Sequence, residues 1–141
     1  MARKMYETPE TLKKERDIAD ILEKSWKCKL HKMHFKLSVD FALCDSVIKA
    51  WVEIKTRTIS STHSDKYMIG LHKIKSCREL ARETSLPFYL VVKFTDGIYY
   101  YKDNMENHEL KIGGRVVTQR DAQDIEPCYY IDMKLFKKLK G

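Results

Sequence analysis

Two carboxylates and a lysine stand on what read as the two strands of one hairpin. Asp40 lies in a short apolar run, and Glu53 and Lys55 lie in the alternating run of residues 50–56. Pairing the two runs antiparallel, with a four-residue loop over residues 45–48, sets Asp40 opposite Glu53. Opposed like charges only about 5 Å apart destabilise a sheet, so the arrangement calls for a cation between them. Lys55 points to the same face.

A helix that precedes the hairpin adds a third carboxylate. Glu15 lies on one stripe of that helix with four apolar residues spaced three or four positions apart, Leu12, Ala19, Leu22 and Trp26. We therefore expect Glu15 to face inward. An inward-facing charge must be paired or bind a metal, because desolvating it alone costs several kcal/mol.

These side chains together predict a metal site. Hard oxygen ligands beside one lysine suit Mg²⁺ or Mn²⁺, which keep most of their waters and bind phosphate oxygens through the remaining positions. Glu15, Asp40, Glu53 and Lys55 thus have the outline of a phosphodiester-hydrolysis site. The triplet Glu53-Ile54-Lys55 by itself also fits a solvated sheet face with weak ion pairs. A second copy, Glu109-Leu110-Lys111, occurs later.

The surrounding elements read as one α/β domain with a mixed sheet. In chain order we expect a helix from Thr8-Pro9 to about Ser25, a strand from Cys28 to Phe35, hairpin strands at 39–43 and 50–56, a helix from about Asp65 to Thr84, and strands at 88–92 and 98–101. Within the hairpin, apolar side chains fill the face opposite the carboxylates, and these are Val39, Phe41, Leu43, Val52 and Ile54. Beyond residue 102 we expect a strand from Glu109 to Val117, a strand at 129–131 and a short basic C-terminal helix.

Length and charge limit the class of protein. The 141 residues suit a single domain, and the formal net charge of +7 is uneven. Residues 1–95 carry the positive excess, whereas residues 96–132 are acidic, so an anionic partner would bind the first part. No stretch is long and apolar enough to span a membrane and no secretory signal is evident, which makes a cytoplasmic protein the expectation.

The motif and its setting resemble the PD-(D/E)xK nuclease superfamily. Asp40 is followed after a hairpin by Glu53-Ile54-Lys55, with Glu15 on a preceding helix and a Lys/Arg-rich helix after it. The layout is most similar to Holliday-junction resolvase-like and small phage-type nucleases. Val39 stands where the superfamily's name has proline, which many members lack.

The resemblance covers about residues 8–102 and implies a restriction-endonuclease-like mixed sheet flanked by helices, in the order α-β-β-β-α-β-β plus small C-terminal elements. The whole chain, residues 1–141, would then be a single nuclease-like domain. The extension of about residues 103–141, with Gly113-Gly114-Arg115 and Asp124-Ile125-Glu126-Pro127, resembles uncharacterised phage-type members.

The resemblance also implies roles for particular residues. Asp40 and Glu53 would bind Mg²⁺ together with the backbone carbonyl of Ile54, and Mn²⁺ would substitute. Glu15 would complete the metal site directly or through water, and Lys55 would position or deprotonate the attacking water. The expected DNA contacts are Lys73, Lys66 and Arg57.

The resemblance implies a Mg²⁺-dependent DNA endonuclease that leaves a 5′-phosphate, and selectivity for branched DNA is a further expectation. A homodimer encoded by a phage and acting in the host cytoplasm would fit the same resemblance. Two alternatives stay open: a catalytically inactive nucleic-acid-binding module of the same fold, and a structural protein whose acidic segment and basic tail mediate self-association.

Overall fold

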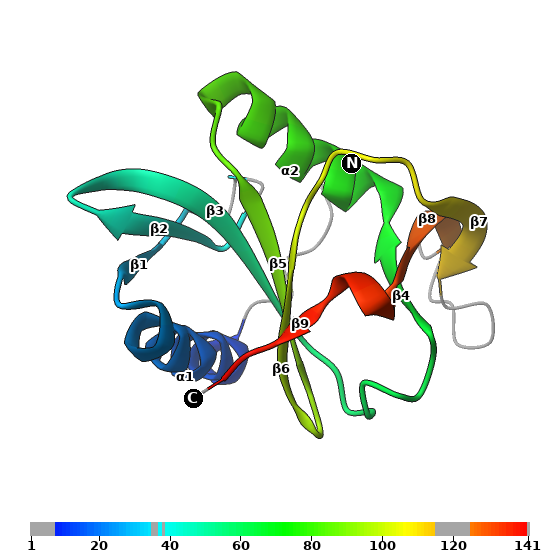
Figure 1. The fold of residues 1–141 in the computed structure, drawn as a ribbon, viewed down its shortest axis with the longest axis horizontal. Helices are drawn as coiled ribbons and strands as arrows, with labels where there is room; N and C mark the ends of the chain where they lie inside the picture. Colours follow the sequence, from blue (N-terminus) through cyan, green and yellow to red (C-terminus); the bar gives the residue numbers. More distant parts are fainter. Residues whose placement is uncertain (1–7, 35–36, 38, 115–124, 141) are drawn as a thin grey trace.

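A computed structural model describes residues 8–34, 37, 39–114 and 125–140. Its elements, in chain order, are α1 (Pro9–Trp26), β1 (Lys29–Lys32), β2 (Phe41–Asp45), β3 (Val47–Thr56), β4 (Lys66–Gly70), α2 (Leu71–Thr84), β5 (Phe88–Phe94), β6 (Gly97–Lys102), β7 (Glu109–Gly114), β8 (Ile125–Asp132), a 3₁₀ turn (Met133–Leu135) and β9 (Lys137–Lys138). Figure 1 shows α1 and α2 on opposite sides of the strands between them.

The strands form two sheets. The larger one has six strands in the order β1-β2-β3-β5-β6-β9, and the smaller one has three in the order β4-β8-β7. In the larger sheet β3 and β5 run parallel and the other neighbours run antiparallel, so the expected mixed α/β fold is confirmed. The parallel β3–β5 pair is joined through α2, as a crossover between parallel strands requires.

The first helix begins where the sequence predicts it. Thr8 and Thr11 form a reciprocal capping box, and Pro9 occupies the first turn, where its missing N–H costs nothing. The helix ends at Trp26, one residue beyond the expected end. Its buried face packs against one side of the larger sheet, and the two elements contribute Ile18, Ala19, Leu22, Phe41, Val52, Ile54 and Val91 to this core.

The second helix and the smaller sheet cover the other side. A separate core joins the inward face of α2 to both sheets through Ile74, Cys77, Ala81, Trp51, Leu90, Ile69 and Ile131. Side chains alternate along β3, so Glu53 and Lys55 lie on the α2 side while Val52 and Ile54 lie on the α1 side.

The register of the β2–β3 hairpin agrees with the prediction at its open end, where Ala42 pairs with Trp51. The predicted four-residue loop is wrong, because Asp45 pairs with Val47 and Ser46 alone turns the chain with φ 67°. A β-bulge between Leu43 and Cys44 absorbs the extra residue. Val39 was expected within this hairpin, but it precedes β2 and packs into the core on the α2 side.

The predicted start of the second helix is also wrong. Residues Lys66–Gly70 form β4, and the helix begins only at Leu71. Tyr67 and Ile69 are buried and alternate with less buried neighbours, which is the pattern of a strand. The partner that makes it a strand is β8, about sixty residues later in the chain. This pairing adds a strand that the expected element order lacks.

Smaller differences occur at three places. The strand expected from Cys28 to Phe35 is confined to β1, and Phe35 itself lies outside the described residues. The strand expected to end at Val117 is described only to Gly114, and Val117, Arg115 and Asp124 are likewise outside them. The expected basic C-terminal helix is instead the 3₁₀ turn followed by β9.

Among the described residues, no helix combines the length and the apolar character needed to cross a bilayer.

Candidate active site

Glu53 is a charged side chain buried inside the fold. It projects from β3 toward α2, and its side chain is 2% exposed. Lys55 Nζ lies 3.3 Å from Glu53 Oε2, and Lys73 Nζ, from the first turn of α2, lies 3.3 Å from Oε1. The carboxylate is therefore held between two ammonium groups that come from different elements.

Asp40 lies beside Glu53 but outside the strand ladder, because β2 begins one residue later. Its Oδ2 accepts a 2.9 Å hydrogen bond from the backbone N–H of Ile54, and its Oδ1 is 3.6 Å from Lys32 Nζ. The side chain is thus turned onto the backbone of β3 instead of facing Glu53 directly across the pair. The hydrogen bond fixes the Asp40 carboxylate next to the Glu53–Ile54 peptide.

Glu15 faces the same region from α1, as its helical stripe predicts. Its side chain is 19% exposed, and Lys32 Nζ donates a 2.9 Å hydrogen bond to its Oε1. Lys32, at the end of β1, therefore stands between Glu15 and Asp40. The structure brings all three predicted carboxylates to one end of the sheet, with an ammonium group between the first two.

Burial, and after it the charge of Asp40, raise the pKa of Glu53 from its usual value of 4.5 to about 7, while Lys55 and Lys73 oppose the shift. A desolvated carboxylate beside another carboxylate is poorly stabilised as an anion. Near neutral pH, an added cation would therefore stabilise the ionised form of Glu53.

The donor set fits a hard divalent ion held by two carboxylates. In the described residues, no group of three or more His, Cys, Asp or Glu side chains is placed to hold one ion. Asp40 and Glu53 remain as two carboxylates, and Mg²⁺ is commonly bound through one or two carboxylates while waters and substrate phosphates fill the other positions. Apart from its ion pair with Lys73, the buried Glu53 Oε1 makes no hydrogen bond within the described part of the chain, so it retains a lone pair for such a ligand.

The three expected DNA contacts lie in different settings. Lys73 pairs with Glu53, as described above, so α2 borders the site. Lys66 forms a 3.2 Å ion pair with Glu109 on the smaller sheet. The guanidinium of Arg57 lies 5.3 Å from the ring centroid of Tyr67. Sequence reasoning missed Lys32 as a site residue, because strand alternation places it on the same face as the buried Leu30.

The second Glu-x-Lys triplet differs from the first in its surroundings. Glu109 and Lys111 lie on β7 with side chains 42% and 57% exposed, and their charges are 3.7 Å apart. The pKa of Glu109 is lowered, mainly by its hydrogen bond with Lys66. This triplet is the solvated surface pair that the sequence allowed for either copy.

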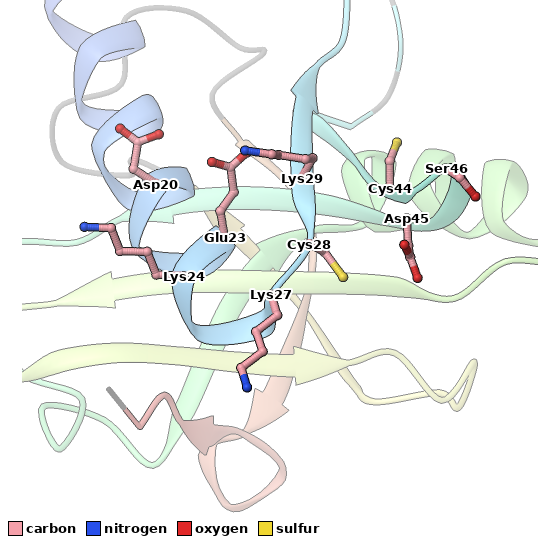
Figure 2. A pocket seen from close by; sticks show the side chains of 9 residues that line it. All are labelled: Asp20, Glu23, Lys24, Lys27, Cys28, Lys29, Cys44, Asp45 and Ser46. Carbon is pink, nitrogen blue, oxygen red and sulfur yellow. The ribbon is translucent and has the colours of Figure 1, made fainter.

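A surface depression of about 640 Å³ lies beside the C-terminal end of α1, and its lining does not include Asp40, Glu53 or Lys55 (Figure 2). Three acidic residues (Asp20, Glu23 and Asp45) and three lysines (Lys24, Lys27 and Lys29) line it. Figure 2 shows the side chains of Lys24 and Lys27 extending in different directions. Groups of both signs that do not converge are typical of a solvated surface.

A mixed sheet between two helices, with Asp40, Glu53 and Lys55 gathered at one end, defines the class of restriction-endonuclease-like nucleases of the PD-(D/E)xK type. Comparison of the sequence with protein families narrows the class. The chain belongs to the family described as "Phage putative PDDEXK endonuclease", whose model matches residues 1–139.

The fold is similar to that of Hjc, a Holliday junction resolvase from the archaeal hyperthermophile Archaeoglobus fulgidus. The two chains superpose with a TM-score of 0.58 over 90% of this chain and 92% of Hjc, at 15% sequence identity. No curated protein matches the chain in sequence. At this identity the likeness to Hjc concerns the fold, and the family assignment rests on the sequence match.

Proposed function

We propose that this protein is a Mg²⁺-dependent endonuclease that hydrolyses phosphodiester bonds of DNA. The observation that carries the proposal is the buried Glu53 carboxylate, flanked by Lys55 and Lys73 and placed beside Asp40. Burying a charge in this way costs several kcal/mol, and a fold keeps such a group where function requires it. Membership of an endonuclease family supports the same reading.

Asp40, Glu53 and the carbonyl of Ile54 would hold the Mg²⁺ ion, and Mn²⁺ would replace it. When bound, the ion polarises the phosphate and lowers the pKa of a coordinated water. Glu15 takes part through Lys32 or through water, because Lys32 lies between it and Asp40. The hydrogen bond from Ile54 N–H holds Asp40 in the orientation that binding needs.

Lys55 is the residue that acts on the reacting groups. Its side chain is 37% exposed, so the ammonium group reaches both Glu53 and a substrate. It orients the attacking water and stabilises the negative charge that develops on the phosphoryl oxygens. Lys73 favours the ionised form of Glu53. Hydrolysis would leave a 5′-phosphate.

The proposed substrate class is supported by the likeness to Hjc, and the proposed assembly by the need to cut two strands. Hjc is a Holliday junction resolvase, so we propose a preference for branched DNA here. A homodimer would let two copies cut two strands of one junction. As a member of a phage family, the protein would act in the cytoplasm of the host cell.

The test uses labelled four-way-junction, linear duplex and single-stranded DNA with Mg²⁺, Mn²⁺ or EDTA. We expect cleavage with either metal, none with EDTA, and the fastest cleavage on the junction. Asp40→Asn and Glu53→Gln should bind DNA but not cut it. Salt-sensitive binding without cleavage by the unmodified protein would instead identify an inactive binding module. If the protein neither binds nor cuts any of these DNAs, the result would favour the alternative of a structural protein that self-associates.

A further inference from the structure

A second crevice, of about 230 Å³, opens just beyond the end of β3, the strand that carries Glu53 and Lys55. It lies between the segment that follows β3 and the free edge of β4 in the smaller sheet, and its lining includes Arg57, Ile59, Lys66, Tyr67, Phe94 and Tyr130. We call it the tyrosine crevice. Arg57 is two residues beyond Lys55, and two residues of a strand span about 6.6 Å. The crevice is therefore adjacent to the proposed cleavage site.

The lining combines aromatic and cationic groups. Tyr130 supplies a partly exposed ring, while Tyr67 and Phe94 are buried and pack edge-on behind it with centroids 6.3 Å apart. Arg57 and Lys66 add two positive charges. Lys66 is partly exposed and paired with Glu109 only through a surface ion pair, which is weak enough to be exchanged for a phosphate. Rings beside positive charges suit a nucleotide, because bases stack on aromatic side chains and phosphates attract cations.

One polar atom at the tyrosine crevice lacks a partner. The side chain of Tyr67 is 5% exposed, and its buried Oη makes no hydrogen bond to any described residue. A buried hydroxyl without a partner is unfavourable, because the hydrogen bonds it made to water in the unfolded chain are not replaced. Arg57 lies over the same ring, 5.3 Å from its centroid, so a positive charge and this hydroxyl belong to the same wall of the crevice.

We propose that the tyrosine crevice receives one unpaired nucleotide of a DNA substrate, with the base stacked on Tyr130 and its phosphate held by Arg57 and Lys66. The proposal rests on the nuclease function and gives it a physical source of selectivity. Extruding a base costs least where it is already unpaired, as at a branch point or a bulge. The volume, equal to that of about eight waters, suits a single base.

The experiment compares three duplexes in EDTA, so that none is cut. One carries a single bulged 2-aminopurine nucleotide, one carries an abasic residue at the same bulge, and one is fully paired. We expect the base-containing bulge to bind about tenfold more tightly than the abasic bulge, because stacking contributes about 1–3 kcal/mol per base. The 2-aminopurine fluorescence should change when the protein is added.

Variants of Tyr130 test the stacking itself. Tyr130 is partly exposed, and its Oη contacts Met68 Sδ at 3.4 Å. Tyr130→Ala should remove the tenfold preference, and Tyr130→Phe, which keeps the ring, should retain it. Tyr100→Ala is the control, because Tyr100 packs against Trp26 on the α1 side of the larger sheet. Thermal melting identifies any variant that fails to fold.

Equal affinities for the base-containing and abasic bulges would overturn the proposal, as would a preference that survives Tyr130→Ala in a folded protein. Cleavage with Mg²⁺ alongside equal affinities would overturn this inference alone and leave the nuclease standing. Absence of both binding and cleavage on every DNA would overturn the proposed function as well.

Discussion

Glu53 shows most clearly how this fold keeps a charged group where it is unfavourable. The folded protein holds the pKa of Glu53 at about 7, against a usual value of 4.5, because the carboxyl is buried beside Asp40. The folded state therefore binds more protons than the unfolded state between these two pH values. Stability should fall as the pH rises through that window.

We compare the unmodified protein with Glu53→Gln in EDTA, between pH 4.5 and pH 7.5. The free energy of unfolding should fall over this range by about 3 kcal/mol more in the unmodified protein than in the variant. Urea unfolding at several pH values measures this difference. Glu109→Gln, at the second triplet, serves as the control, because the pKa of Glu109 is lowered instead of raised. A Glu53→Gln profile parallel to that of the unmodified protein would contradict the prediction.

Glu15 and Asp40 should differ in their effect on metal binding. Lys32 separates Glu15 from Asp40, so we predict that Glu15→Gln weakens Mn²⁺ binding by about tenfold, as residues that orient ligands do. Asp40→Asn should weaken it much further, because it removes a ligand. Isothermal titration calorimetry in the absence of DNA measures both. Equal losses would place Glu15 among the direct ligands.

The sequence could indicate these carboxylates because side-chain spacing limits which residues share a face. It could not reveal that Lys32 and Lys73 contact them. Lys32 reaches Glu15 only once α1 packs across β1, and Lys73 reaches Glu53 only once α2 crosses β3. Tertiary packing decides both contacts, and no local pattern encodes them.

At the scale of elements, a buried ion pair ties α2 to the segment after β6. Arg78 binds Asp103 through two hydrogen bonds of 2.8 and 2.9 Å, and the Asp103 side chain is 0% exposed. Tyr101 Oη adds a third contact to Asp103. The pair therefore fixes the end of β6 against the helix that carries Lys73.

We predict that Arg78→Met destabilises the protein by about 3–5 kcal/mol, because Asp103 loses its buried partner. Asp17→Asn, which breaks the exposed Lys13–Asp17 pair on α1, should cost less than about 1 kcal/mol. Chemical denaturation compares the two variants under one condition. Similar small losses would show that the buried pair does not lock α2 in place.

The elements that sequence patterns predicted well are those with local signals. Thr8-Pro9 marks the start of α1, and the strands expected at 88–92 and 98–101 lie within β5 and β6. β4 was mistaken for the start of a helix because its strand character depends on pairing with β8, far along the chain. Strands were expected at 109–117 and 129–131, where β7 and β8 lie, but their assembly with β4 into a separate sheet was missed for that reason. The turn at Ser46 was missed because a non-glycine residue there adopts a positive φ.

Over the whole molecule, the positive charge predicts salt-dependent DNA binding. The formal net charge is +7, and Arg57, Lys66 and Lys73 all lie close to the proposed site or to the tyrosine crevice. We predict that Arg57→Ala weakens binding to paired DNA of any sequence and lowers the slope of log affinity against log salt by about 1. Lys13→Ala, on the exposed side of α1, should change neither. Fluorescence anisotropy across a salt series provides the measurement, and an unchanged slope for Arg57→Ala would remove this residue from the DNA contacts.

The measurement that tests the central claim most directly compares DNA cleavage by Lys55→Ala and Lys111→Ala with Mg²⁺. The two variants remove the same charge from the same Glu-x-Lys pattern, but only Lys55 lies at the buried carboxylate. We predict that Lys55→Ala cuts at least about a hundredfold more slowly while still binding DNA, and that Lys111→Ala cuts at the normal rate. Equal rates for the two variants would contradict the assignment of the active site.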